Sequence, residues 1–142
     1  MSDRPVAQGL LDTNLVILLP RLRDATVLPE VPLISAITLA ELSAGPLVAR
    51  TDEERAARQA HLQQAEADFD PLPFDAAAAR AFGQVAASLR RAGRKTAARA
   101  YDAMIAATAL ANDLPLYTCD PADFAGIGGL AVVAVPHPDA SG

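Results

Sequence analysis

The chain has little of what disulfide-stabilised and zinc-binding proteins depend on. Its 142 residues include one cysteine, Cys119, and two histidines, so no disulfide can form within the chain. Only 4% of the residues are aromatic although 51% are hydrophobic, so alanine and aliphatic side chains must fill the core. Because alanine is the best helix former, this composition favours a fold rich in helix.

The sequence also lacks a recognisable targeting or membrane segment. The apolar run at residues 10–19 is interrupted by Asp12, is too short to span a bilayer and is not followed by a small-residue cleavage site. We therefore expect a cytoplasmic protein. The length has room for one domain, 1–142, for which we predict a core at about 9–135 and a loose tail at 136–142.

Short apolar runs alternate with helical stretches along the chain. Strands are expected at 9–12, 32–35, 69–74, 116–118 and 130–135. Helices are expected at 13–19, 35–44, 51–68, 75–91 and 97–111, with a helical turn at 121–124. Two prolines give the run at 69–74 the character of an edge strand. The alternation predicts an α/β fold of three layers, with a central parallel sheet flanked by helices.

Four acidic residues stand where an ordinary surface position is a poor explanation. Asp12 and Asp120 each follow an apolar strand, and ligands of α/β sheets bind at the carboxyl ends of strands, near a topological switch point. Glu41 and Asp102 lie in helices with almost no other charge. An aspartate at a strand end can also serve only as a turn or helix cap, so each residue alone is weak evidence.

Taken together, the four acids predict a metal site. Carboxylates are rarely buried unless something pairs with them, and no basic residue is interleaved in these motifs. A hard divalent cation would relieve the repulsion, and Mg²⁺ and Mn²⁺ accept carboxylate oxygens. Zinc is not favoured, because His61 and His137 lie far from these motifs.

Basic residues are outnumbered but unevenly distributed. The formal charge is −5, which is unusual for a protein that binds nucleic acid. Five of the twelve basic residues nevertheless fall within ten positions, namely Arg90, Arg91, Arg94, Lys95 and Arg99. The segment is either a solvated helix end or a surface that holds a phosphate backbone beside Asp102.

Four segments of the chain resemble those of the PIN-domain nucleases, and more narrowly of the VapC toxins. Their order and spacing run through residues 9 to about 135. The segments are Leu-Leu-Asp12-Thr13-Asn14, Ile-Ser-Ala-Ile-Thr-Leu-Ala-Glu41-Leu, Tyr-Asp102-Ala-Met-Ile-Ala-Ala-Thr-Ala-Leu-Ala and Leu-Pro-Leu-Tyr-Thr118-Cys-Asp120-Pro-Ala-Asp123-Phe124.

This resemblance implies a PIN-like fold and a metal-dependent endoribonuclease. It implies a Mg²⁺ or Mn²⁺ site formed by Asp12, Glu41, Asp102 and Asp120. It further implies the toxin of a type II toxin–antitoxin pair, which inhibits translation or growth until a VapB-type antitoxin neutralises it, and a homodimer. Transfer, ribosomal and messenger RNA all stay open as targets.

The resemblance leaves several roles open. Relatives often carry asparagine at the position of Asp120, so Asp123 is an alternative late ligand and both could contribute. Thr13 and Thr118 are candidates for hydroxyls that orient the acids, and Asn14 either orients a ligand or caps a helix. RNA contacts are expected from Arg91, Arg94, Lys95 and Arg99.

The predicted mechanism is in-line attack of an activated water on the scissile phosphate, with one metal ion or two about 4 Å apart. Asp12 and Asp102 would be the principal ligands, and Glu41 would bind a second metal or orient the water.

Three other classes of protein share part of this pattern. A phosphoacceptor receiver domain needs a late lysine, but the only lysine is Lys95, between two helices. An aspartate-nucleophile phosphatase needs an acid two residues after Asp12, where Asn14 stands. A non-catalytic PIN-like binding module remains the alternative, although it has no need for four acids.

Overall fold

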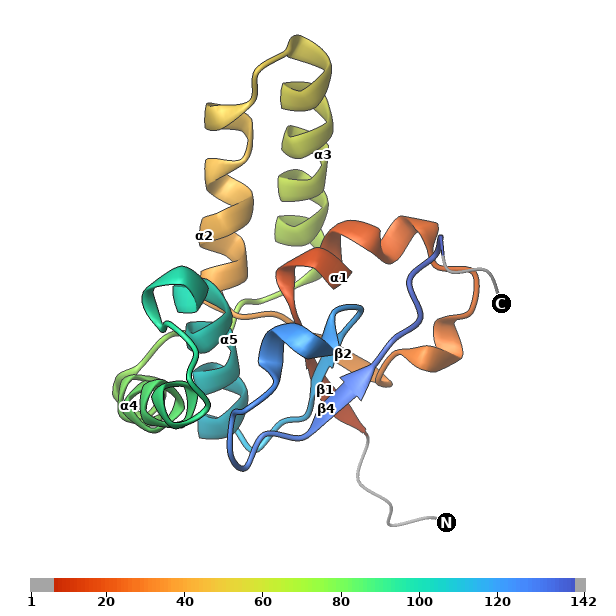
Figure 1. The fold of residues 1–142 in the computed structure, drawn as a ribbon. Helices are drawn as coiled ribbons and strands as arrows, with labels where there is room; N and C mark the ends of the chain where they lie inside the picture. Colours follow the sequence, from red (N-terminus) through yellow and green to blue (C-terminus); the bar gives the residue numbers. More distant parts are fainter. Residues whose placement is uncertain (1–6, 140–142) are drawn as a thin grey trace, which may run out of the picture.

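The computed structural model describes residues 7–139, which form a parallel sheet covered by helices (Figure 1). The sheet has the strand order β2-β1-β3-β4, and every pair of neighbours is parallel. The strands are β1 (Gln8–Leu11), β2 (Val31–Leu33), β3 (Leu116–Thr118) and β4 (Val132–Ala134). The α/β fold predicted from the sequence is thus confirmed. The chain leaves β1 towards β2 and later returns on the other side of β1 to β3, so the strand order switches direction between β1 and β3.

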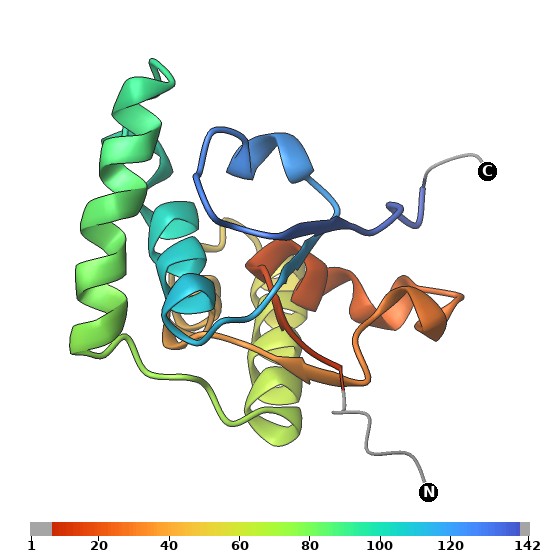
Figure 2. The ribbon, with the colours of Figure 1, turned by 90° about the horizontal axis from the view of Figure 1, so that it is seen from below.

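Five α-helices and five short 3₁₀ turns connect the strands of the described chain. The α-helices are α1 (Thr13–Leu18), α2 (Ala36–Ala44), α3 (Asp52–Asp68), α4 (Ala76–Arg91) and α5 (Ala100–Ala111). The turns are η1 (Leu19–Arg21), η2 (Ala25–Val27), η3 (Pro46–Val48), η4 (Ala97–Arg99) and η5 (Pro121–Phe124). Helices α2 and α3 form a hairpin that projects away from the sheet in Figure 1, whereas α4 and α5 lie side by side in Figure 2.

Side-chain caps begin the helices where the sequence predicts them. Ser35 accepts from the Thr38 amide at 3.1 Å, and Asp75 caps α4 in the same way. Thr51 accepts from the Glu54 amide at 3.1 Å, but Glu54 reaches back to the amide of Arg50 instead of that of Thr51. The predicted capping box therefore forms with one half displaced by a residue.

Two predicted boundaries differ from the structure. Residues 69–74 form no strand, because only Leu72 makes a single parallel bridge, to Ser35. Pro71 and Pro73 flank Leu72 and have no amide hydrogen, so the ladder cannot extend. The predicted helix at 97–111 starts as η4 and becomes α-helical only at Ala100.

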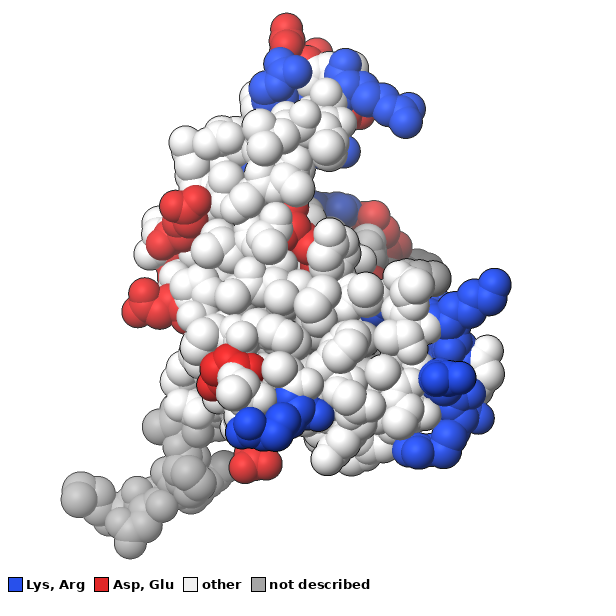
Figure 3. Space-filling model, turned by 90° about the vertical axis from the view of Figure 1, so that its left-hand side faces the viewer, with Lys and Arg blue, Asp and Glu red and all other residues white. Residues whose placement is uncertain are grey.

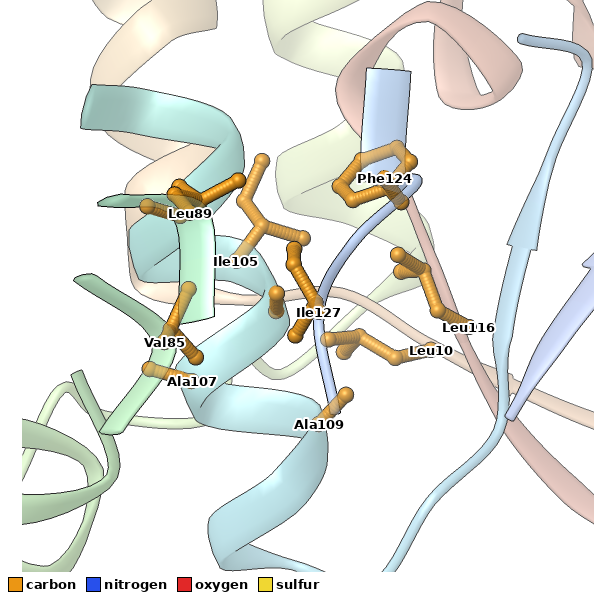
Figure 4. Close-up of a cluster of buried hydrophobic side chains, with 11 residues drawn as sticks. Leu10, Val85, Leu89, Ile105, Ala107, Ala109, Leu116, Phe124 and Ile127 are labelled. Atoms are coloured by element: carbon orange, nitrogen blue, oxygen red, sulfur yellow. The ribbon is translucent and has the colours of Figure 1, made fainter. Parts of the chain in front are cut away.

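The sheet separates two hydrophobic clusters. Leu10 and Leu11 are neighbours on β1 and both fully buried, but they belong to different clusters because successive side chains of a strand point to opposite faces. One cluster packs α4 and α5 against the sheet, with Leu89, Ile105 and Phe124 among its side chains (Figure 4). The other joins the sheet to α1, α2 and α3. Both clusters hold β1 and β3 rigidly, and with them the ends of these strands.

None of the helices between residues 7 and 139 is long and apolar enough to cross a bilayer. Of the predicted loose tail at 136–142, residues 140–142 lie outside the described residues, and Asp139 accepts a hydrogen bond from the Arg21 guanidinium. The extent of the domain and the loose tail stay predictions.

Candidate active site

Asp12 occupies the first residue after β1 and caps α1. Its Oδ1 accepts from the Leu15 amide at 2.9 Å, and its Oδ2 accepts from the Thr118 hydroxyl at 2.5 Å. The residue is only 4% exposed. Burial raises the pKa of Asp12, the two hydrogen bonds oppose that rise, and the charges of Asp120 and Asp123 add to it. Asp12 is therefore a fixed carboxylate at the switch point of the sheet.

Thr118 ties the end of β3 to the end of β1. Its hydroxyl donates to Asp12 and accepts from the Asp120 amide at 2.9 Å, so both of its roles are used. Asn14 Nδ2 donates to Asp120 Oδ2 at 3.3 Å. Thr118 and Asn14 thus contact the two aspartates that follow the central strands, and their part in orienting metal ligands stays a prediction.

Replacing Thr118 with valine should damage both stability and cleavage. The substitution keeps the shape of the side chain but leaves the buried Asp12 Oδ2 and the Asp120 amide without their partner. We expect unfolding free energy to fall by about 1–3 kcal/mol. We expect RNA cleavage to fall by about 10- to 100-fold, as for other groups that orient a metal ligand. Urea unfolding and a cleavage assay measure the two effects.

Thr108→Val is the matched control for Thr118→Val. Thr108 is also fully buried, but its hydroxyl donates to the Met104 carbonyl at 2.9 Å within α5. Its loss should leave cleavage unchanged. Wild-type cleavage by Thr118→Val, in protein shown to be folded, would remove the orienting role of the Thr118 hydroxyl.

Glu41, on α2, is oriented by a line of hydroxyl groups. Thr13 Oγ1 donates to Glu41 Oε1 at 2.7 Å, so the 2.9 Å contact between Thr13 and Thr38 must have Thr38 as its donor. Ser35 in turn donates to Thr38 at 3.5 Å, and both are fully buried. Burial raises the pKa of Glu41, and the bond from Thr13 lowers it. The sequence reasoning identified Thr13 but missed Thr38, although it lies one helical turn before Glu41.

Asp102, in the first turn of α5, has a strongly raised pKa. Burial raises its pKa to about 6, helped by the charges of Asp123, Glu41 and Asp12 and opposed by Arg99. These couplings mean that the acids named from separate segments of the sequence meet in one region. Because its negative charge is unfavourable here, the Asp102 carboxylate is stabilised by binding either a proton or a cation.

The two late acids, Asp120 and Asp123, lie differently in this region. Asp120 is bonded to Asn14 and its charge acts on Asp12. Asp123 acts on both Asp12 and Asp102, but its Oδ1 lies 3.3 Å from Arg99 Nη1 in a half-exposed ion pair. Arg99 is therefore partly engaged inside the acidic region, and a cation binding Asp123 would compete with it.

The carboxylates of this region suit a hard divalent ion, but they do not surround a single position. All candidate donors are carboxylate oxygens, which Mg²⁺ and Mn²⁺ prefer. Within residues 7–139, no three His, Cys, Asp or Glu side chains are close enough to hold one ion together. An ion would therefore contact one or two carboxylates in this arrangement and keep several waters, which is the usual habit of Mg²⁺. The roles of the individual acids as ligands stay predictions.

Two grooves meet at Glu41. The first holds about 180 Å³ and is lined by Thr13, Asn14, Ile17, Glu41, Leu42, Gly45, Arg58 and His61. The second holds about 490 Å³ and is lined by Glu41, Ala97, Arg99, Ala100, Tyr101 and Asp102. An extended polymer could thus reach Glu41 through either groove.

The histidines lie nearer to the acids than the sequence suggested. His61 shares a groove with Glu41, because α3 packs against α2 in the hairpin. His137 lines another groove with Asn14 and Asp120, because the chain after β4 runs back over α1. The two histidines are therefore far from the acidic motifs in sequence but share grooves with acids in space, and within residues 7–139 they complete no metal-holding group with them.

The basic residues of the segment 90–99 differ in what their side chains contact. Basic side chains gather at the edge of the face that α4 presents in Figure 3, and Arg90, Arg91 and Lys95 are exposed. Arg94 is different, because its Nη1 donates to the carbonyls of Ala122 and Ala125 at 3.1 and 2.6 Å. Arg94 therefore fastens the turn that carries Asp123. Arg91 Nη2 instead donates to Ser88 Oγ of its own helix at 3.4 Å, and Lys95 is exposed.

Comparison with known proteins connects this geometry to a family. The PIN domain family model matches residues 10–130. Ribonuclease VapC5 of Mycobacterium tuberculosis is 39% identical over 137 residues, which cover 95% of this chain and 98% of that protein. The tRNA(fMet)-specific endonuclease VapC of Shigella flexneri is 33% identical over 85% of this chain and 92% of its own length.

A solved structure agrees in fold as well as in sequence. The crystal structure of VapBC-5 from Mycobacterium tuberculosis, a member of the VapBC family of toxin–antitoxin systems, matches with a TM-score of 0.77 and 37% identity. The match covers 91% of this chain and 99% of that one. A family model spanning most of the chain, and relatives aligned over nearly their whole length, lead to one assignment: the chain belongs to the PIN-domain family, among its VapC members.

Proposed function

We propose that this chain is a metal-dependent endoribonuclease and the toxin of a type II toxin–antitoxin pair. It cleaves RNA phosphodiester bonds and thereby inhibits translation or growth until an antitoxin neutralises it. The observation that carries the proposal is that Asp12, at the switch point of the sheet, and Glu41 lie near enough for their charges to act on Asp102, with the pKa of each of the three raised by burial. The names of the relatives, ribonuclease and endonuclease, support the same activity.

PIN-domain nucleases depend on divalent metal ions, and we propose Mg²⁺ or Mn²⁺ for this chain. Asp12 and Asp102 would be its principal ligands, with Asp120 or Asp123 beside them, and the ion would supply Lewis-acid activation of the phosphate and of water. The protein supplies orientation: Asp12 is fixed by two hydrogen bonds. Glu41 has Oε1 held by Thr13, which leaves Oε2 to accept a proton from the attacking water.

We propose partners as well. The VapBC structures support a VapB-type antitoxin as the protein partner, and the ribonuclease names support RNA as the substrate. A homodimer and a cytoplasmic location stay part of the proposal. Transfer, ribosomal and messenger RNA remain alternative targets.

Removing Arg91 and Lys95 together should weaken RNA binding in a salt-dependent way. Each phosphate contact to single-stranded RNA contributes about 0.7 to the slope of log affinity against log salt. The Arg91→Ala/Lys95→Ala protein should therefore show a slope smaller by about 1 to 2 units. Fluorescence anisotropy of a labelled RNA over a salt series measures it. Arg94 is left intact because it fastens the turn at Asp123.

The control for this double variant removes two other exposed arginines, Arg23 and Arg80. It changes the net charge equally but lies outside the basic segment, so its salt slope should match the wild type. If the two double variants had equal salt slopes, Arg91 and Lys95 would make no phosphate contacts, and the basic segment would be only a solvated surface.

The function is tested by incubating antitoxin-free protein with a mixed pool of structured RNA. We expect discrete fragments with Mg²⁺ or Mn²⁺, none with chelator, and none when the cognate antitoxin is added in excess. Intact RNA after incubation with folded, metal-supplied protein would favour the non-catalytic PIN-like binding module.

A further inference from the structure

We propose that Tyr101 and Arg99 form a subsite that holds one unpaired nucleotide of the RNA beside the acids, its base stacked on the Tyr101 ring. This inference rests on the proposed function and narrows it, since it specifies single-stranded RNA at the point of cleavage. It follows from the exposure of Tyr101, from its position and from the groove it lines.

Tyr101 is exposed where burial would be expected. The chain has only six aromatic residues, four Phe and two Tyr. Tyr101 is 58% exposed, and no other aromatic ring appears among the exposed large hydrophobic side chains of the described residues. Those side chains are Leu47, Val48, Tyr101 and Val132. An aromatic ring left in water offers a face on which a base can stack.

The position of Tyr101 determines which nucleotide it could reach. Tyr101 directly precedes Asp102, so their Cα atoms are about 3.8 Å apart. Both residues also line one groove, so a base resting on Tyr101 would belong to a nucleotide close to the phosphate on which the acids act.

The groove beside Tyr101 has the size and lining for a nucleotide. It holds about 490 Å³, and the small side chains of Ala97 and Ala100 leave its wall open. Arg99 lines the same groove, and the hydrogen bonds of its guanidinium to other described residues use Nη1, towards Asp123. The remaining donors of the guanidinium can meet a phosphate. Cation and aromatic ring together are the usual components of a single-strand site.

An unpaired base fits these observations better than a duplex. Within a duplex both faces of a base are covered by its neighbours, so stacking on a side chain requires a base that is splayed out. Loops and single strands supply such bases. The peptide of an antitoxin is the competing occupant, and the experiment separates it.

The experiment uses the scarcity of fluorophores in this chain. It has no tryptophan and two tyrosines, of which Tyr117 is half-buried in β3. Titration with an unstructured RNA of twelve adenosines, in chelator and in parallel with Ca²⁺, should quench tyrosine emission if a base stacks on Tyr101. Anisotropy of the labelled RNA gives the affinity in the same samples, and a gel checks that the RNA stays intact.

Two variants give the expected pattern. Tyr101→Phe keeps the ring and should bind within about 2-fold of wild type, but the quenching should disappear. Tyr101→Ala removes the ring and should weaken binding about 5- to 100-fold. The wild type should bind the adenosine RNA more tightly than the same RNA annealed to its complement, and Tyr101→Ala should lose much of that preference.

Several results would overturn the subsite. Undiminished RNA affinity in Tyr101→Ala, or quenching that persists in Tyr101→Phe, would do so. Unchanged RNA affinity with weakened antitoxin binding would assign Tyr101 to the antitoxin instead. Failure of the proposed function is separate, because it would show as wild-type protein that leaves RNA intact, whereas quenching and affinity are measured without cleavage.

Discussion

Asp102→Asn should abolish RNA cleavage, with a loss of at least about 1,000-fold. The substitution keeps the size of the side chain and replaces a carboxylate oxygen with an amide nitrogen, which cannot ligate a metal ion. It acts at the acid whose charge is coupled to Asp123, Glu41 and Asp12, so it weakens the whole group as a cation site. Initial rates of RNA cleavage in Mn²⁺ measure the effect.

Asp70→Asn is the matched control for the loss of activity. Asp70 is exposed, follows α3 and lies apart from the acidic group, so the same chemical change should leave the rate unaltered. If Asp102→Asn cleaved RNA within a few-fold of wild type, Asp102 would have no part in the active centre.

The second large effect concerns stability without metal. Asp102 has a pKa of about 6 in the folded protein against 3.8 as its ordinary value. Between these two values the unfolded chain releases the proton while the folded protein retains it. Stability should therefore fall as pH rises from about 4 to about 6 and level off above that. The raised pKa values of Asp12 and Glu41 act in the same direction.

Asp102→Asn should reduce this loss of stability. Two pKa units correspond to about 3 kcal/mol, and solvent screening at this half-buried position reduces the effect to roughly 1–2 kcal/mol. In chelator at pH 7.5 the variant should melt about 2–8 °C above wild type. Saturating Mn²⁺ should raise the melting temperature of wild type more than that of the variant.

Melting curves in chelator at pH 4.5 and 7.5 provide the comparison. The difference between variant and wild type should be small at the lower pH and larger at the higher pH. If the melting temperature of the variant at pH 7.5 equalled that of wild type, the negative charge of Asp102 would not destabilise the fold, whether or not cleavage were lost.

The layout of the acids followed from rules that act locally or through topology. Asp12 and Asp120 could be paired from sequence because parallel strands end at the same edge of a sheet. Asp102 could be selected because a carboxylate among Ile105, Ala106 and Ala109 on one helix face is rarely tolerated without a partner.

Other features depended on packing that sequence does not display. Thr38 joins the hydrogen-bond line to Glu41 only because α1 and α2 bring two hydroxyls within 2.9 Å. His61 reaches the groove at Glu41 through the folding back of α3. Arg94 was expected at the RNA, yet two carbonyls of a turn 28 and 31 residues away accept its hydrogen bonds. Such contacts are set by the crossing of elements, not by residue type.

The chemical ends of the RNA fragments test the central claim most directly, which is that carboxylates and a divalent ion direct water to the phosphate. Attack by water leaves one fragment with a phosphate and the other with a hydroxyl, and it forms no 2′,3′-cyclic phosphate. The account predicts such ends in Mn²⁺, still formed when the nucleotide at the cleavage position is 2′-deoxy, and absent with Asp102→Asn. Cyclic phosphate ends that persist in chelator would contradict it, because they would show attack by the 2′-hydroxyl of the RNA without a metal ion.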